Sequence, residues 1–191
     1  EGILKGMYLF RPAADRRAKL RAQLLGSGAI LPEALKAQEI LAEKYGVAAD
    51  VWSVTSYKEL YRDGQAAERW NMLHPDKKPR VPYVTEITRN AQGVFVAATD
   101  YLKVLPNLIQ RWLPRPLFAL GTDGFGRSDT RAALRNFFEV DARFITLATL
   151  TALVRKGQLD LKVAVQAIPP DWWPNPPTLR NFELFFYRAP A

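Results

Sequence analysis

Few residues of this chain could carry out chemistry directly, and its only histidine is the first to consider. His74 ends the segment Trp70-Asn-Met-Leu-His74, beside a stretch rich in proline. A nucleophilic triad needs a serine or cysteine and an orienting acid around the histidine, and nothing in the sequence places them there. We therefore interpret His74 as a structural hydrogen-bonding residue and expect no catalytic residue in this chain.

Two glycine-rich segments match known phosphate-binding loops only in part. The first, Gly26-Ser-Gly28, follows a predicted strand, but Leu31 stands where a dinucleotide-binding fingerprint has its third glycine. The second, Gly121-Thr-Asp-Gly-Phe-Gly126, lacks the Gly-Lys-Ser/Thr end of a P-loop. We interpret both as structural turns, the second with Ser128 and Asp129 capping the next helix, and predict no cofactor site in either.

A metal site is not indicated either, because the chain has one histidine and no cysteine, and its acids show no ligand spacing. Two pairs of opposite charge are candidate salt bridges instead. They are Arg62 with Asp63, and Asp123 with Arg127.

The elements that would position these residues alternate between strands and helices. Short apolar runs predict strands at residues 20–25, 50–55, 94–98 and 117–120. Helical periodicity predicts helices at residues 32–45, 57–73 with an interruption near Gly64, 100–113, 128–138, 141–156 and 160–168. This order favours an α/β fold, a three-layer α/β/α sandwich with a mostly parallel sheet. Because parallel strands end at one edge, residues 26–28, 55–56, 99–100 and 121–124 should gather there.

Composition is typical of a single domain. The 191 residues are 48% hydrophobic and 24% charged, and no apolar run approaches the roughly 20 residues of a membrane span. The absence of cysteine excludes disulfides and fits a cytoplasmic protein. Because residue 1 is glutamate and no signal-peptide pattern follows it, we expect the chain to start inside a longer gene product.

The net charge of +8 raises nucleic acid as a partner. Residues 1–21 hold six basic against two acidic residues, which is half of that excess, and no aromatic residues alternate with the basic ones. We interpret the basic residues as a solvated edge or a contact with an acidic neighbouring domain, and do not expect nucleic-acid binding.

The end of the chain differs from the rest. Five prolines fall between residues 169 and 177, so neither a regular helix nor a central strand can cross them. We expect a domain over residues 1–168 and a tail rich in proline and aromatic residues over 169–191, whose last part, residues 182–187, would be an edge strand or an apolar appendage.

Several segments together resemble one family, the C-terminal domain of the homodimeric-type pyruvate dehydrogenase E1 component, a thiamine-diphosphate enzyme related to transketolase. Their order and spacing fit from residue 1 to about residue 168, whereas the tail departs from the family. The segments include Arg62-Asp-Gly-Gln65 and Leu120-Gly-Thr-Asp-Gly-Phe-Gly-Arg-Ser-Asp129, together with residues 1–8, 24–28, 54–56, 68–75, 79–83, 99–101 and 138–141.

The resemblance implies a mixed, mostly parallel sheet of about five strands, with the fifth near Tyr83 or around residues 143–150. It also implies that thiamine diphosphate and Mg²⁺ are bound by the other E1 domains, and that this domain has no cofactor of its own. The expected partners are those domains, a second E1 subunit and, indirectly, the E2 acetyltransferase. The expected contacts lie in loops at residues 62–65, 68–74 and 121–129, with these candidate interface residues: Arg62, Asp63, Arg69, His74, Asp123, Arg127 and Asp129.

Three functions remain open at this point. A noncatalytic E1 domain predicts strong association with the missing domains. A free-standing α/β module for a small anion or a protein partner predicts a folded monomer with its own ligand. Nucleic-acid binding through residues 5–21 predicts an affinity that falls steeply with salt.

Overall fold

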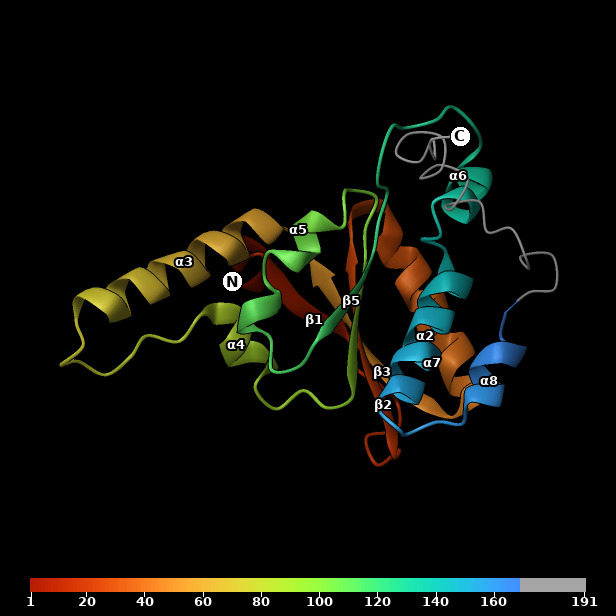
Figure 1. Cartoon of the computed structure of the whole chain (residues 1–191), viewed down its shortest axis with the longest axis horizontal. Helices are drawn as coiled ribbons and strands as arrows, with labels where there is room; N and C mark the ends of the chain where they lie inside the picture. Colours follow the sequence, from red (N-terminus) through yellow and green to blue (C-terminus); the bar gives the residue numbers. More distant parts are fainter. Residues whose placement is uncertain (169–191) are drawn as a thin grey trace, which may run out of the picture.

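The computed structural model describes residues 1–168 as a five-stranded mixed sheet between two layers of helices (Figure 1). The strand order is β1-β3-β2-β4-β5. Strands β2, β3, β4 and β5 are mutually parallel, and β1 runs antiparallel to β3 at the edge. The strands are β1 (Met7–Arg11), β2 (Leu20–Ser27), β3 (Val47–Val54), β4 (Val94–Ala98) and β5 (Leu117–Leu120).

Helices cover both faces of this sheet. One layer holds α2, α7 and α8, and the other α3, α4 and α5 (Figure 1). This arrangement confirms the predicted α/β/α sandwich. The helices are α1 (Gly2–Lys5), α2 (Leu31–Tyr45), α3 (Tyr57–Leu73), α4 (Tyr83–Thr88), α5 (Val104–Asn107), α6 (Arg131–Phe137), α7 (Ala142–Arg155) and α8 (Leu161–Gln166), with 3₁₀ turns at Gly28–Ile30 and Gln110–Trp112.

The central strands are mostly apolar, as expected of strands that helices cover on both sides. All five residues of β4 are buried, as are residues 22–27 of β2. One core lies between the sheet and α2 with α7, and includes Leu24, Leu41 and Leu150. The other lies between the sheet and α3 and includes Leu60 and Phe95.

The fifth strand is not where the resemblance suggested. Tyr83 begins helix α4, and residues 143–150 lie in helix α7, so both suggested positions are wrong. The fifth strand is β1, which pairs with only one neighbour. Residues 7–10, Met-Tyr-Leu-Phe, form a short apolar run of the kind that predicted the other strands, but this strand was not predicted; Leu9 and Phe10 are exposed at this edge.

Two predicted helices also differ from the structure. Helix α3 continues through Gly64, because that glycine lets the ring of Trp112 lie against the helix: a Cβ there would come within 2.6 Å of the ring. The segment at residues 100–113 is broken into α5 and a 3₁₀ turn. Pro106 lacks an N–H and restricts the residue before it, so a regular helix cannot extend far upstream.

Within residues 1–168, no helix is long and apolar enough to cross a membrane. The predicted tail at residues 169–191, including the suggested edge strand at 182–187, lies outside the described residues.

Candidate interaction surfaces on helix α3 and at the strand ends

The carboxyl ends of β2, β4 and β5 meet as predicted. The hydroxyl of Ser27 donates to Oγ1 of Thr99 at 2.8 Å, and both residues are buried. The backbone N–H of Thr122 donates to the carbonyl of Tyr101 at 2.8 Å. Thr55 follows β3, whose last residue Val54 is the register partner of Ser27 in the parallel strand β2, and its hydroxyl donates to the carbonyl of Ile3 in α1. All four predicted segments therefore lie at the same edge of the sheet.

Asp123 joins the loops that follow β4 and β5. One carboxylate oxygen accepts from the backbone N–H of Lys103 at 3.0 Å, and the other lies 2.9 Å from its ammonium. The predicted pairing with Arg127 is therefore wrong, and the guanidinium of Arg127 lies 4.1 Å from the centre of the Phe137 ring. Because the carboxylate is bound within the domain on both oxygens, Asp123 is a structural residue of the loop.

The cap of α6 also differs from the prediction. Thr130 is the N-cap, and its hydroxyl accepts from the N–H of Ala133. Asp129 instead accepts from the backbone N–H of Thr130 at 2.6 Å, and neither Ser128 nor Asp129 caps the helix. The loop at residues 121–129 is thus built from internal contacts.

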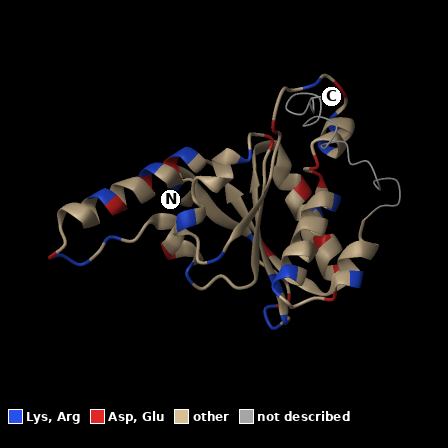
Figure 2. Cartoon of the chain, in the orientation of Figure 1, with Lys and Arg blue, Asp and Glu red and all other residues tan. Residues whose placement is uncertain are grey.

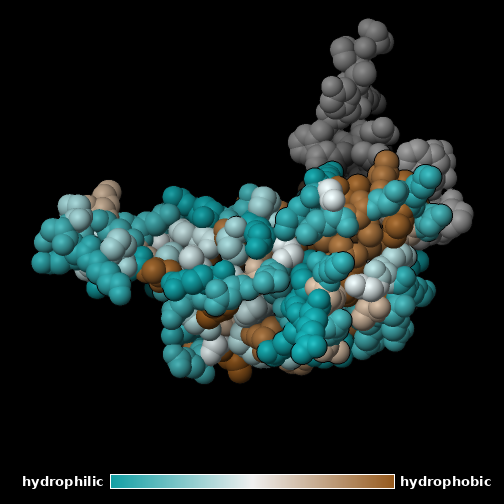
Figure 3. Space-filling model, turned by 90° about the horizontal axis from the view of Figure 1, so that it is seen from below, coloured by the Kyte–Doolittle hydropathy of each residue, from teal (hydrophilic) through white to brown (hydrophobic). Residues whose placement is uncertain are grey.

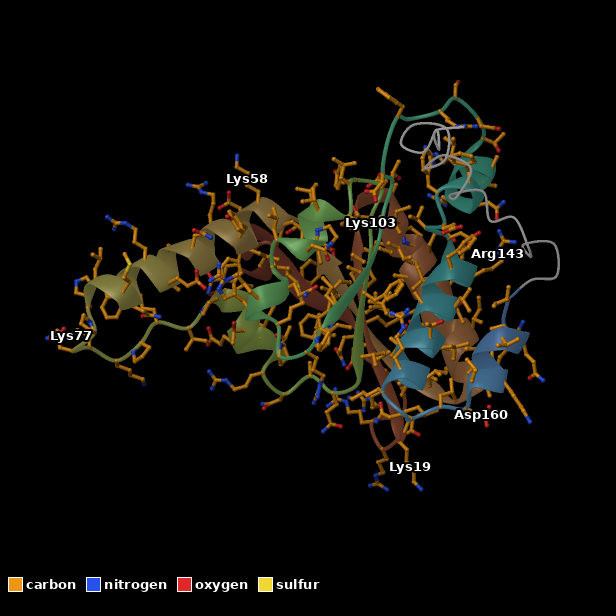
Figure 4. All side chains as sticks on the ribbon, in the orientation of Figure 1. Lys19, Lys58, Lys77, Lys103, Arg143 and Asp160 are labelled. Carbon is orange, nitrogen blue, oxygen red and sulfur yellow. The ribbon has the colours of Figure 1, made fainter. Side chains whose placement is uncertain are left out.

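Apolar side chains are exposed beside this loop. Tyr101, Leu102 and Val104 are about half exposed, and Phe125 is 79% exposed. Lys103 marks this end of the molecule in Figure 4. The edge therefore combines satisfied polar groups with uncovered apolar surface, an arrangement suited to contact with another protein surface.

The second surface is an arm, residues 68–82, formed by the end of α3 and the segment that returns from it. The arm extends away from the sheet and Lys77 lies at its tip (Figures 1 and 4). At its base, the carboxylate of Glu68 accepts from the indole N–H of Trp112 at 2.9 Å and pairs with Arg111 at 2.9 Å. These contacts anchor α3 to the body of the domain.

Aromatic and polar contacts hold the returning segment against α3. The ring of His74 stacks on Trp70 with 4.6 Å between centroids, and its Nδ1 lies 2.9 Å from the Trp70 carbonyl. The guanidinium of Arg80 lies 4.4 Å from the centre of the Trp70 ring. The side chain of Asn71 makes two hydrogen bonds with the backbone of Arg80. The contacts of His74 agree with the structural role that we predicted.

Polar residues cover most of the arm, but three apolar side chains are uncovered. Met72 is 71% exposed, Leu73 51% and Val81 46%. Charged residues follow the same helix (Figure 2). Internal contacts fix the arm before any partner binds. Little conformational entropy would therefore be lost when a partner covers these side chains.

Five of the seven candidate residues lie on these two surfaces, which are well separated in Figure 1, and Arg62 and Asp63 lie in α3 before the arm. Arg62, Asp63 and Arg69 lie in α3 and His74 follows it, so residues 62–65 and 68–73 are helical rather than the predicted loops. Arg62 pairs with Glu59 rather than with Asp63. Asp63 instead accepts from the backbone N–H at the start of α4. Asp123, Arg127 and Asp129 belong to the other surface.

Sequence reasoning missed the residues that hold the arm together. Trp112 is separated from Glu68 by 44 positions, and no local pattern links them. Asn71 and Arg80 lie on either side of the proline-rich segment. The sequence signal for Asn71 and Arg80 was that they lie in two segments that resemble the family, residues 68–75 and 79–83.

The described residues contain no cluster of His, Asp or Glu that could hold a metal ion. At the glycine-rich strand ends, the N–H groups of Lys103 and Thr122 already donate within the domain. The predicted alternative, a small-anion module at these ends, therefore lacks free donors at these two positions.

Comparison with known proteins shows what this chain is similar to. The family model for the transketolase-like TK C-terminal domain matches residues 6–141. The pyruvate dehydrogenase E1 component of Pseudomonas aeruginosa is 50% identical over 169 residues, 88% of this chain and 19% of that protein. The corresponding protein of Escherichia coli K12 is 49% identical over the same shares. The chain thus spans about a fifth of the length of these relatives.

Solved structures show the same fold at low sequence identity. A transketolase from Leishmania mexicana superposes with a TM-score of 0.54 at 16% identity, over 81% of this chain and 19% of that one. A split-gene transketolase, described as an inactive β4 tetramer, has a TM-score of 0.52 at 18% identity, over 78% of this chain and 43% of that one. These structures support the fold alone.

Proposed function

This chain belongs to the transketolase-like TK C-terminal domain family, and we propose that it is the noncatalytic C-terminal domain of a cytoplasmic pyruvate dehydrogenase E1 component. Its role is to support assembly, with residues 1–168 as the domain. The identity of 50% over 88% of the chain is the observation that carries this proposal. The parent reaction is the thiamine-diphosphate-dependent decarboxylation of pyruvate, and its product passes to the E2 acetyltransferase.

The described residues do not fit a site for thiamine diphosphate and Mg²⁺. They contain no ligand cluster, and Asp123, the carboxylate of the glycine-rich loop, is bound to Lys103. We assign both groups to the remaining E1 domains, which would make up most of the roughly fivefold longer relatives. No step of the reaction is assigned to the side chains of this domain.

The arm and the strand-end surface are the proposed contact regions. Each combines internally bonded polar groups with exposed apolar side chains, among them Met72 and Leu73 in the arm and Leu102 at the strand ends. The proposed partners are the remaining E1 domains and a second E1 subunit. Of the seven candidates, His74 and Asp123 hold the shape of these surfaces, and Arg69, Arg127 and Asp129 lie at their exposed side. Arg62 and Asp63 lie in α3 before the arm, where Asp63 bonds to the start of α4.

Sedimentation velocity of this chain mixed with the N-terminal and middle domains of an E1 component tests the proposal. We expect a complex for the unchanged chain. The double substitution Met72→Asp/Leu73→Asp should weaken the affinity of this complex at least tenfold, because buried contacts of this kind contribute about 1 kcal/mol or more each. The matched control replaces two similarly exposed apolar residues of α8, Leu161→Asp and Val165→Asp.

The control pair should leave the complex unchanged. If the unchanged chain forms no complex, the assembly role is wrong. If both double variants weaken the complex equally, the assignment of the arm as a contact is wrong.

A further inference from the structure

A cavity lies at the end of the sheet opposite to the glycine-rich loops. It has a volume of about 440 Å³ and is formed by the start of β4, the start of β5 and the end of α7. Small-molecule sites commonly have volumes of about 300–1,000 Å³. The lining residues are 93–95, 114–118, Ala152, Arg155 and Lys156.

The floor of this cavity is apolar. On the face covered by α7 it is formed by Val94, which is buried, with Phe118 and Ala152 packed against the same core. Because β5 is the last strand of the sheet, the ring of Phe118 is covered only in part. Figure 3 views the molecule from this end, and apolar surface gathers on the side where α2, α7 and α8 lie.

Three cations and no acid line the same cavity: Arg115, Arg155 and Lys156. None of them forms an ion pair with a carboxylate in the described part of the chain. The guanidinium of Arg155 lies 5.8 Å from the centre of the Phe118 ring, above the apolar floor. Lys and Arg also gather at this lower end of the sheet in Figure 2.

Arg115 is the member of this group that points most directly to a ligand. Its Nε is buried and has no hydrogen-bond partner among residues 1–168. A buried donor without an acceptor is unfavourable, and an anion in the cavity would supply one if the guanidinium turned toward it. Arg155 and Lys156 also interact favourably with the helix dipole at the end of α7. That interaction explains their positions, but it does not explain Arg115 or the cavity.

We propose that this cavity binds a small organic carboxylate with an apolar body. The carboxylate would accept from Arg115 and lie close to Arg155 and Lys156, and the apolar body would cover Phe118 and the floor. Guanidinium groups bind carboxylates with paired hydrogen bonds, which distinguishes such a ligand from a neutral molecule of the same length. This site is separate from the arm and does not depend on the assembly role.

Isothermal titration calorimetry of the full chain with octanoate and with octan-1-ol tests the proposal. The two probes share their chain length and differ in charge. We expect octanoate to bind at least tenfold more tightly than octan-1-ol. Arg115→Gln should lower the affinity for octanoate about tenfold and leave octan-1-ol unchanged, and Arg155→Gln should act in the same direction.

The matched control is Arg131→Gln, an exposed arginine of α6 that should leave octanoate binding unchanged. Thermal unfolding of each variant checks that the fold is retained, and Arg155→Gln provides the test if Arg115→Gln unfolds. Equal affinities for octanoate and octan-1-ol, or no binding of octanoate, would overturn the proposal. So would an equal loss of affinity in the Arg131→Gln control.

Discussion

Replacing Gln23 by leucine should destabilise the domain strongly, although the two side chains are similar in size. Gln23 is fully buried in β2. Its Oε1 accepts from the indole N–H of Trp52 at 2.7 Å, and its Nε2 donates to Asp50 at 2.9 Å and to the carbonyl of Gln92 at 2.8 Å. One side chain thus satisfies polar groups from β3 and from the turn before β4.

The magnitude follows from the groups that lose their partner. The indole N–H of Trp52, a residue 7% exposed, would have no acceptor, which costs about 1–3 kcal/mol. Asp50 would lose one charge-assisted bond, worth about 1.5 kcal/mol, but would keep Arg21 and the N–H of Ala13. With partial compensation from the apolar leucine, the free energy of unfolding should fall by about 2–4 kcal/mol.

Urea unfolding followed by tryptophan fluorescence measures this loss, and thermal unfolding should show a fall in Tm of about 4–16 °C for a chain of this length. The matched control is Gln65→Leu in α3, an exposed glutamine that bonds only to the hydroxyl of Tyr61 at 3.1 Å. It should change stability by at most about 0.5 kcal/mol. If both variants lost the same stability, the reasoning about the buried network would be refuted.

Three further predictions concern glycine conformation, a buried hydroxyl and a buried carboxylate. Gly93→Ala should cost at least about 3 kcal/mol in urea unfolding, because φ is +93° and a Cβ would overlap the β2 backbone. Gly124→Ala, with φ +87° and open space, should cost only about 1 kcal/mol. Burial raises the pKa of Tyr57, whose hydroxyl has no partner among the described residues, so the folded state holds this proton more tightly than the unfolded state. This contribution is complete below the ordinary pKa of about 10 and declines above it, so Tyr57→Phe should lose less stability than the unchanged chain between pH 9 and 11. Glu33→Gln should destabilise by about 1–3 kcal/mol in thermal unfolding, because the buried carboxylate accepts from two cations and one backbone N–H, whereas exposed Glu39→Gln should stay within about 0.5 kcal/mol.

The parts of the fold that were predicted from sequence have strong local patterns. Residues 94–98 are all apolar, and the structure places them in a strand buried on both faces. The helix predicted at residues 32–45 is α2, Leu31–Tyr45, and Gly46 ends it with a positive φ. In both places the local preference and the tertiary structure favour the same conformation.

The missed parts depend on distant contacts. Strand β1 forms because Met7 is buried at the sheet edge beside β3, more than forty residues away in sequence. Helix α3 continues through Gly64 because a tryptophan from another element packs there. Neither contact leaves a periodic signal in its own segment.

The candidate surfaces were predicted in outline, but the contacts within them were not. The contact segments at residues 62–65 and 68–74 were expected in loops, although helical periodicity predicted a helix over 57–73, and that helix, α3, is confirmed. Asp123 shows why its contact was missed: its partner Lys103 is 20 positions away, whereas Arg127 is only four. Sequence proximity favours one pairing, and the meeting of the β4 and β5 loops determines the other.

The most direct test of the assembly role is thiamine-dependent pyruvate decarboxylation by an E1 component truncated to its N-terminal and middle domains. The activity should be low alone and should rise to saturation as this chain is added, while the Met72→Asp/Leu73→Asp variant should require at least tenfold more protein. Activity that is already complete without the chain, or that never responds to it, would contradict the account.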